Sequence, residues 1–210
     1  MSIGIAIALN DMVLLVADGR HPGSRLAPTD QPEKITAKGD TLAIIEFGDD
    51  VSARTAATQL QQAATASMTG RGITDAIVEI VQRSGTPLRE VTGKQVGLIA
   101  GGIDAEGAWV GGAVFGHGLA EPLTQLARPG KGELQFVVLG GEPVGAKAFF
   151  TDLASRAMSA SGDDAQGLLV MLQRAAKKTI RHAANRGYAT AGRVEWRLLV
   201  KGQPTRAGYL

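Results

Sequence analysis

The opening of the chain restricts its possible folds more than any other segment. Large apolar side chains alternate with small ones over residues 3–9 (Ile-Gly-Ile-Ala-Ile-Ala-Leu), and residues 12–17 are apolar at every position. Asn10 and Asp11 separate the two segments, so residues 2–18 predict a β-hairpin with a tight turn. Because a strand that is apolar on both faces must be covered on both faces, the hairpin indicates stacked layers.

The rest of the chain predicts further strands in pairs, with a few single strands. A second pair is expected over 34–36 and 41–47, around a turn at Lys38-Gly39-Asp40, and residues 19–33, which contain three prolines, are expected to be irregular. Further strands are expected at 95–103, 108–115, 134–139 and 194–201.

Helices are expected in two pairs. In the first pair, Asp49 or Asp50 caps a helix that continues to about Met68, and Thr74 caps a helix that ends at Gly85. Val51, Leu60 and Ala64 are expected on the buried side of the first of these helices. In the second pair, one helix starts at Pro143, and the other is capped by Asp163 or Asp164 and continues to about Asn185.

The order of elements predicts an α+β fold. Strands, two helices, strands, two helices and a last strand indicate two stacked antiparallel sheets, each flanked by a helix pair, which is a four-layer αββα sandwich. We expect residues 1–210 to form a single domain, because no repeat or linker interrupts them. An anion site at Gly140-Gly141 before a helix is a minority interpretation, since no GxGxxG or GxxxxGK[ST] pattern is present.

Composition argues against several classes of function. The chain has no cysteine, which excludes disulfides, thiolate zinc sites and a Cys nucleophile, and we expect a cytoplasmic protein without a signal peptide or membrane span. Basic residues are scattered and aromatic residues make up 4%, so we expect no nucleic-acid binding. His21 and His117 have no ligand pattern around them, and we expect neither a metal nor a cofactor.

Ser2 is the candidate nucleophile. Removal of Met1 would place a hydroxyl and a free α-amine on one residue, and an α-amine with a pKa of about 7.7–8.0 can act as general base for its own hydroxyl. The hairpin would bring Asp18 back beside Ser2, and Lys34 could add a positive charge that Asp18 holds in place. Taken singly, Ser2 would be a common second residue, Asp18 a strand-end residue and Lys34 a solvated charge.

The segment from Ser2 to Asp18 resembles the opening hairpin of proteasome β-type subunits and of the related bacterial two-ring peptidase. These N-terminal nucleophile (Ntn) hydrolases begin the mature chain with a nucleophilic Thr, and their second strand ends in Ala-Asp-X-Arg, here Ala-Asp-Gly-Arg at 17–20. In the same count, the family's catalytic lysine falls on Lys34. The glycine of its oxyanion hole falls on Gly48, although residues 46–49 can also be aligned onto the Gly-Asp pair that opens the family's first helix.

The resemblance extends further at lower strength. Residues 98–107 are similar to the family's central hairpin, and residues 140–143 (Gly-Gly-Glu-Pro) resemble the Gly/Ser-Pro segment before its third helix. The chain departs from the family in carrying Ser as nucleophile. Where the family has supporting Ser, Asp and Ser residues, this chain has Gly140 or Gly141, His182 and Asn185.

The resemblance implies an endopeptidase-type amide hydrolase that assembles into homo-oligomeric rings. Its substrate would be an unfolded polypeptide or peptide, and an ATP-dependent unfoldase could deliver it. Two alternatives stay open at this point. One is a catalytically weak or inactive ring or scaffold subunit of the same fold, and the other is a small-molecule Ntn amidase.

Overall fold

The opening hairpin forms the centre of one antiparallel sheet. In the computed structural model, which describes residues 2–18, 33–65, 67–140, 143–162, 164–189 and 193–210, β1 (Gly4–Leu9) pairs with β2 (Met12–Asp18). Asn10 in the turn has a φ of 50°, a conformation that Asn tolerates better than most residues. The sheet has the order β10-β9-β2-β1-β8; its other strands are β8 (Leu134–Leu139), β9 (Val194–Val200) and β10 (Arg206–Tyr209).

The second sheet follows sequence order and is also antiparallel. Its strands run β3-β4-β5-β6-β7, and each pairs with the next along the chain. The strand pairs expected in this part of the sequence are confirmed. The strands are β3 (Ile35–Lys38), β4 (Leu42–Gly48), β5 (Gln95–Asp104), β6 (Gly107–Gly116) and β7 (Leu123–Ala127).

Four α-helices form two pairs, as the sequence predicts. The helices are α1 (Asp50–Ala63), α2 (Gly70–Gly85), α3 (Pro143–Ser161) and α4 (Ala165–Asn185), and a 3₁₀ turn, η1 (Thr86–Leu88), follows α2.

Two of the predicted helix boundaries are wrong. α1 ends at Ala63, five residues before Met68, and there the Lys38 ammonium donates to the carbonyls of Gln61 and Ala64 at 2.5 Å each. The N-cap of α2 is Thr69, whose hydroxyl accepts from the Gly72 amide, whereas Thr74 is buried inside the helix. The predicted caps Asp49 and Asp164 are both confirmed.

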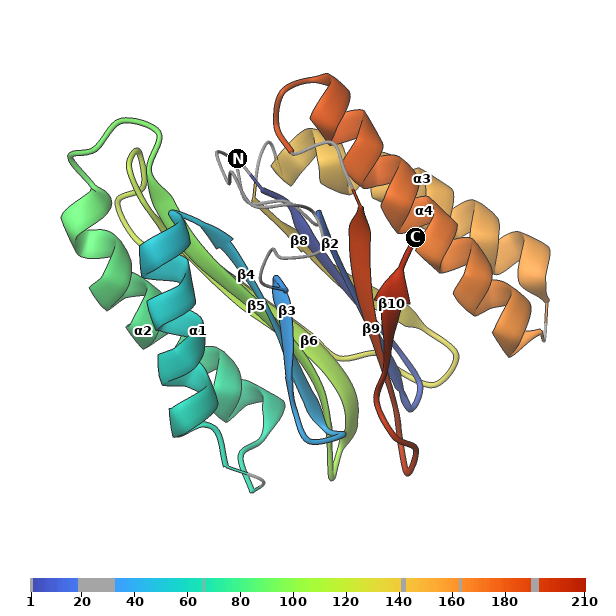
Figure 1. Cartoon of the computed structure of the whole chain (residues 1–210). Coiled ribbons are helices and arrows are strands. Elements are labelled where there is room, and N and C mark those ends of the chain that lie inside the picture. The colour runs from blue at the N-terminus through green and yellow to red at the C-terminus, as the bar shows by residue number, and fades with distance from the viewer. Residues whose placement is uncertain (1, 19–32, 66, 141–142, 163, 190–192) are drawn as a thin grey trace.

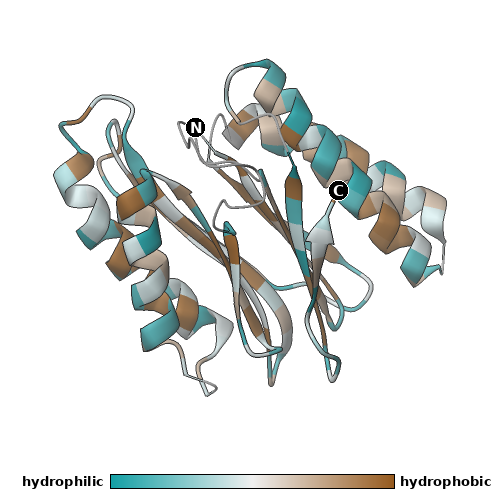
Figure 2. Ribbon diagram, viewed as in Figure 1, coloured by the Kyte–Doolittle hydropathy of each residue, from teal (hydrophilic) through white to brown (hydrophobic). Residues whose placement is uncertain are grey.

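The layers are stacked as helices, sheet, sheet, helices (Figure 1). One apolar cluster joins α1 and α2 to the β4–β6 face, a second joins α3 and α4 to β1, β2 and β9, and a third fills the space between the sheets. Apolar residues gather on the strands and on the helix faces that cover them, with polar residues on the outer helix faces (Figure 2). No helix within the described ranges combines the length and the apolar character needed to cross a membrane.

The alternation of large and small residues in β1 has a direct packing role. Its isoleucines face α3 and α4, while Ala6 and Ala8 belong to the cluster between the two sheets. A Cβ on Gly4 would lie 2.9 Å from Ile99 Cδ1 and 3.1 Å from Ile45 Cγ2, both in the opposite sheet. The small face therefore lets the sheets approach closely at the end where Ser2 begins.

Some features were not predicted, because solvent exposure removes the apolar pattern. β7 and β10 are edge strands whose side chains are mostly exposed or half-buried.

The prediction that Val51 lies on the buried side of α1 is wrong: it is 77% exposed, and alanines together with Leu60 form that side. Most of the expected irregular segment 19–33 lies outside the described residues.

Candidate active site

The hairpin register brings Asp18 beside the start of the chain. The Asp18 amide donates to the Ile3 carbonyl at 3.3 Å, and the Ile3 amide donates to Asp18 Oδ1 at 3.2 Å. Asp18 therefore lies next to the residue that follows Ser2, as the predicted hairpin requires.

Lys34 completes a buried chain of polar contacts across the two sheets. It directly precedes β3, and its Nζ donates to Ser2 Oγ at 2.9 Å and to Asp18 Oδ1 at 3.0 Å. The exposed fractions are 4% for Ser2, 0% for Asp18 and 2% for Lys34. The alternative interpretation of Lys34 as a solvated charge is therefore wrong, and the three predicted residues lie together.

This arrangement can stabilise negative charge on the Ser2 hydroxyl oxygen. A buried ammonium loses its hydration, which is tolerated when a carboxylate pairs with it and its other protons find acceptors. Here Asp18 supplies the carboxylate and Ser2 Oγ a second acceptor. Because water is largely excluded, the field of the Lys34 ammonium at Oγ is stronger than it would be at the surface.

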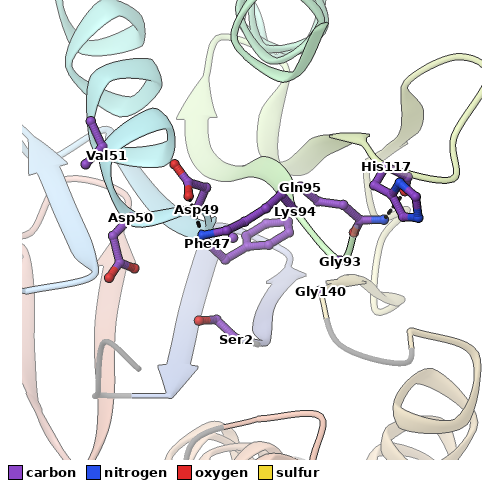
Figure 3. A pocket seen from close by; sticks show the side chains of 11 residues that line it. Ser2, Phe47, Asp49, Asp50, Val51, Gly93, Lys94, Gln95, His117 and Gly140 are labelled. Atoms are coloured by element: carbon purple, nitrogen blue, oxygen red, sulfur yellow. Dashed lines mark hydrogen bonds and ion pairs between the residues drawn. The ribbon is translucent and has the colours of Figure 1, made fainter. Parts of the chain in front are cut away.

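Ser2 lies on the wall of a cleft with a volume of about 440 Å³. The cleft is formed by the segment before β1, the junction of β4 and α1, the start of β5, and the residue after β8 (Figure 3). Its lining residues include Phe47, Gly48, Asp49, Lys94, His117 and Gly140.

Two glycines shape the backbone around Ser2. Gly48, the predicted oxyanion-hole residue, lines the same cleft and has a φ of 105°, and a Cβ there would lie 2.2 Å from the Gln95 carbonyl oxygen. Gly140 has a φ of 89°, and a Cβ there would lie 2.2 Å from the carbonyl oxygen of Ser2. Only glycine fits either position without a backbone shift. Gly141, the other candidate for the family's supporting Ser, lies outside the described residues.

An ion pair closes the side of the cleft at the start of α1. Lys94 Nζ lies 2.8 Å from Asp49 Oδ1, while Asp49 also caps α1 by accepting from the Ser52 amide (Figure 3). The hydrogen bond from Lys94 holds the pKa of the Asp49 carboxyl below its ordinary value. The pair fixes the β4–α1 junction against β5, and with it the position of Gly48.

Sequence reasoning missed Glu195, a buried carboxylate behind Lys34. Its two oxygens accept from the backbone amides of Lys34, at 2.9 Å, and Ile35, at 3.3 Å. Burial raises the pKa of Glu195 to about 7, against the lowering effect of these hydrogen bonds. The signal was present in β9 (Val-Glu-Trp-Arg-Leu-Leu-Val), where charged residues alternate within an otherwise apolar strand.

Among the described residues, Ser2 Oγ is hydrogen-bonded to Lys34 and not to His182 or Asn185, the α4 residues at the family's supporting positions. The His182 ring stacks on Phe149 of α3, with centroids 4.4 Å apart and 7° between the planes, and Asn185 is exposed at the end of the helix. Whether His182 could support Ser2 was left open by the sequence, and in this structure its ring packs between the two outer helices. Nδ1 of His117 lies 3.0 Å from the Arg89 carbonyl oxygen.

The described residues hold no recognisable metal site, and the sequence has no match among known families. Across the described parts of the chain, no group of three or more His, Asp or Glu residues is placed to hold a metal ion. His21 lies outside those parts. The sequence matches no protein-family model and no curated protein.

Proposed function

We propose that the chain is an N-terminal nucleophile amide hydrolase of the proteasome type, with Ser2 as nucleophile once Met1 has been removed. The observation that carries the proposal is the buried contact chain from Ser2 Oγ through Lys34 Nζ to Asp18 Oδ1. A buried lysine that donates to a serine hydroxyl at the wall of a cleft is an activating arrangement for a nucleophile. The two stacked sheets, each covered by a helix pair, support the same assignment.

The first half of the reaction forms an ester on Ser2. Oγ attacks the carbonyl carbon of an amide, and its proton passes to the Ser2 α-amine, directly or through one water. The Lys34 ammonium stabilises charge on Oγ, and the Gly48 amide donates to the carbonyl oxygen as it becomes negative. The C–N bond then breaks, the leaving nitrogen takes the proton back from the α-ammonium, and the acyl group stays on Oγ.

The second half releases the acid. A water attacks the ester carbon while the α-amine accepts its proton, and the tetrahedral intermediate again places its charge at Gly48. When the C–O bond breaks, Oγ recovers a proton from the α-ammonium, and the carboxylic acid leaves. Ser2 returns to its starting state with no cofactor involved.

The substrate that we propose is a peptide bond in an unfolded chain. A cleft of about 440 Å³ lies within the size range of small-molecule sites, which suits one or two substrate side chains beside Ser2. Homo-oligomeric rings and delivery by an ATP-dependent unfoldase are part of the same proposal. A sizing measurement tests the rings, since a mass near one chain of 21.8 kDa would contradict them.

Intact-mass spectrometry together with Ser2→Ala tests the proposal. We expect the purified protein to lack Met1, and Ser2→Ala to reduce hydrolysis of fluorogenic peptides by a factor of about 10³ or more, because it removes the nucleophile. Ser159→Ala, at an exposed serine on α3, is the matched control and should keep full activity.

Two results would sink the assignment. Retention of Met1 in an active protein would mean that Ser2 carries no free amine. Unchanged peptide hydrolysis in Ser2→Ala, in protein from which Met1 is absent, would mean that another residue is the nucleophile.

A further inference from the structure

β9, the strand next to the edge of its sheet, reaches across to the residue that carries the active-site ammonium. Glu195, Arg197 and Leu199 alternate along β9 and so share a face, and Leu199 is buried between the two sheets. Glu195 and Arg197 continue that face toward the start of β9, and both contact Ile35, where β3 of the other sheet begins. Two charged residues on the inner face of an apolar strand require partners.

Both side chains find their partners on the backbone around Lys34. Glu195 accepts from the amides of Lys34 and Ile35 at 2.9 and 3.3 Å, and Arg197 Nε donates to the Ile35 carbonyl at 2.9 Å. The Arg197 guanidinium also pairs with the Glu33 carboxylate. β3 is an edge strand, so Glu195 and Arg197 supply the hydrogen bonds that a neighbouring strand would otherwise make.

The Lys34 backbone is therefore held from two directions. Its carbonyl accepts from the Glu46 amide of β4 at 3.1 Å, and its amide donates to Glu195 of β9. The side chain that starts at this fixed point ends at Ser2 Oγ, 2.9 Å away. A long side chain holds such a geometry only when its backbone is fixed, because each free dihedral spreads the position of the ammonium.

We propose that Glu195, assisted by Arg197, is a positioning residue that holds the Lys34 backbone and thereby aims the Lys34 ammonium at Ser2. Glu195 touches neither Ser2 nor the cleft and acts only through Lys34. Its effect on catalysis rests on the proposed function, whereas its effect on the placement of Lys34 does not.

We call Glu195, Arg197 and the backbone that they bind the clasp. The contacts of Glu195 make the clasp sensitive to pH. Burial raises the pKa of Glu195 to about 7, the nearby Glu33 carboxylate adds to this rise, and Arg197 opposes it. The other charged groups near it are Lys34 and Asp18, which pair with each other, and Tyr209 is its cross-strand partner on β10. When the pH rises through about 7, the carboxylate becomes anionic and accepts more strongly from both amides.

Ionisation of Glu195 strengthens its hydrogen bonds to Lys34 and Ile35 but lowers the stability of the fold. Since the folded-state pKa of Glu195 lies above its ordinary value of 4.5, its protonated form contributes stability at low pH. That contribution is complete below about 4.5 and is lost as the pH rises through about 7. Ionised Glu195 thus holds Lys34 more firmly while lowering the free energy of unfolding.

The first test needs no catalytic activity. NMR of the intact protein should show the backbone amides of Lys34 and Ile35 shifting with pH around a midpoint of about 7. Glu195→Gln keeps the shape but cannot ionise, so both titrations should disappear. The Lys34 ¹³Cε signal should move in this variant, while that of Lys201, an exposed lysine, should stay.

The second test is kinetic. Glu195→Gln should lower kcat for a fluorogenic peptide about tenfold, with KM within about twofold, because the ammonium is misplaced while the cleft is intact. Glu195→Ala, which keeps no acceptor, should lose more. Glu79→Gln, at an exposed glutamate on α2, is the control and should match the unsubstituted protein.

The outcomes separate this proposal from the proposed function. The clasp proposal is overturned if the chemical shifts of the Lys34 and Ile35 amides do not change with pH. It is also overturned if the Lys34 ¹³Cε chemical shift is unchanged in Glu195→Gln, or if that variant folds and keeps full kcat. If Glu195→Gln does not fold, the titration of the unsubstituted protein still decides whether Glu195 holds the two amides. Retained activity in Ser2→Ala would instead contradict the proposed function. The NMR result would then decide by itself whether the clasp positions Lys34.

Discussion

Two of the ion pairs that join distant segments differ in where their hydrogen bonds go. In the first, Lys34 and Asp18 are 2% and 0% exposed; in the second, Arg128 and Asp104 are 28% and 10% exposed. Asp104 receives two hydrogen bonds from the Arg128 guanidinium, at 2.9 and 2.8 Å, and one each from the amides of Gly70 and Glu106. All of these donors connect segments of the fold to one another.

The Lys34 pair directs one of its donors to a hydroxyl instead. Lys34 Nζ divides its hydrogen bonds between Asp18 and Ser2 Oγ, and Ser2 lines a cleft. The Arg128–Asp104 pair also binds the amides of Gly70 in α2 and Glu106 in the β5–β6 turn, and so fastens α2 to the β5–β6 hairpin. The Lys34–Asp18 pair is less exposed, and its lysine also donates to a hydroxyl beside a cleft. Stability alone does not require that second hydrogen bond.

The largest expected difference between the pairs is in catalysis. Lys34→Met should reduce peptide hydrolysis by a factor of about 10³, because it removes the only cation bonded to Ser2 Oγ in the described residues. Arg128→Met should leave kcat and KM within about twofold, since Asp104 lines no part of the cleft. Steady-state assays on both variants measure the two losses of activity. Equal losses would contradict a catalytic role that is special to the Lys34–Asp18 pair.

A second expected difference is in stability. Lys34→Met leaves Asp18 buried without its lysine and should lower the free energy of unfolding by about 3 kcal/mol. The double variant Asp18→Asn/Lys34→Met should recover much of this stability without recovering activity, because no buried charge is left uncompensated.

For Arg128→Met we expect a loss of about 1 kcal/mol, because water reaches part of that pair. Urea unfolding followed by circular dichroism gives all three values. A double variant as unstable as Lys34→Met alone would show that the Lys34–Asp18 pair itself stabilises the fold.

The smallest expected effect is the response of the Asp104 pair to acid. Hydrogen bonds from Arg128 lower the pKa of Asp104 to about 2, from an ordinary value of 3.8. The ionised form therefore contributes stability above about pH 3.8, and this contribution is lost as the pH falls through about 2. Asp104→Asn should unfold more readily than the unsubstituted protein at pH 7, by about 1 kcal/mol, and the gap should close toward pH 2. A gap that is constant with pH would contradict the ionic account.

The sequence allowed the layers and the site residues Ser2, Asp18 and Lys34 to be predicted, and local patterns account for all of these except Lys34. Alternation in β1 and the apolar run in β2 specify the hairpin, whose register alone determines that Asp18 returns to Ile3. The placement of Lys34 needed the resemblance as well, since no local pattern says that a lysine after a proline-bearing loop is buried.

The remaining parts of the site depend on contacts between distant elements. Glu195 meets Lys34 across 161 positions of sequence, and only the pairing of β9 with β2 brings the two together. His182 depends on such a contact too: the sequence left its role open, and only the packing of α4 on α3 places its ring on Phe149. The edge strands β7 and β10 escaped prediction because water covers enough of their side chains to remove the alternation.

The small face of β1 has a consequence for how mutations act at a distance. Ser2 lies just before β1 of one sheet and Lys34 just before β3 of the other, so their 2.9 Å contact depends on the spacing of the two sheets. Gly4, Ala6 and Ala8 set that gap by contributing almost no volume. A methyl group added there would act as a wedge, so the tolerance of this strand to substitution should follow side-chain volume even at positions that never touch a substrate.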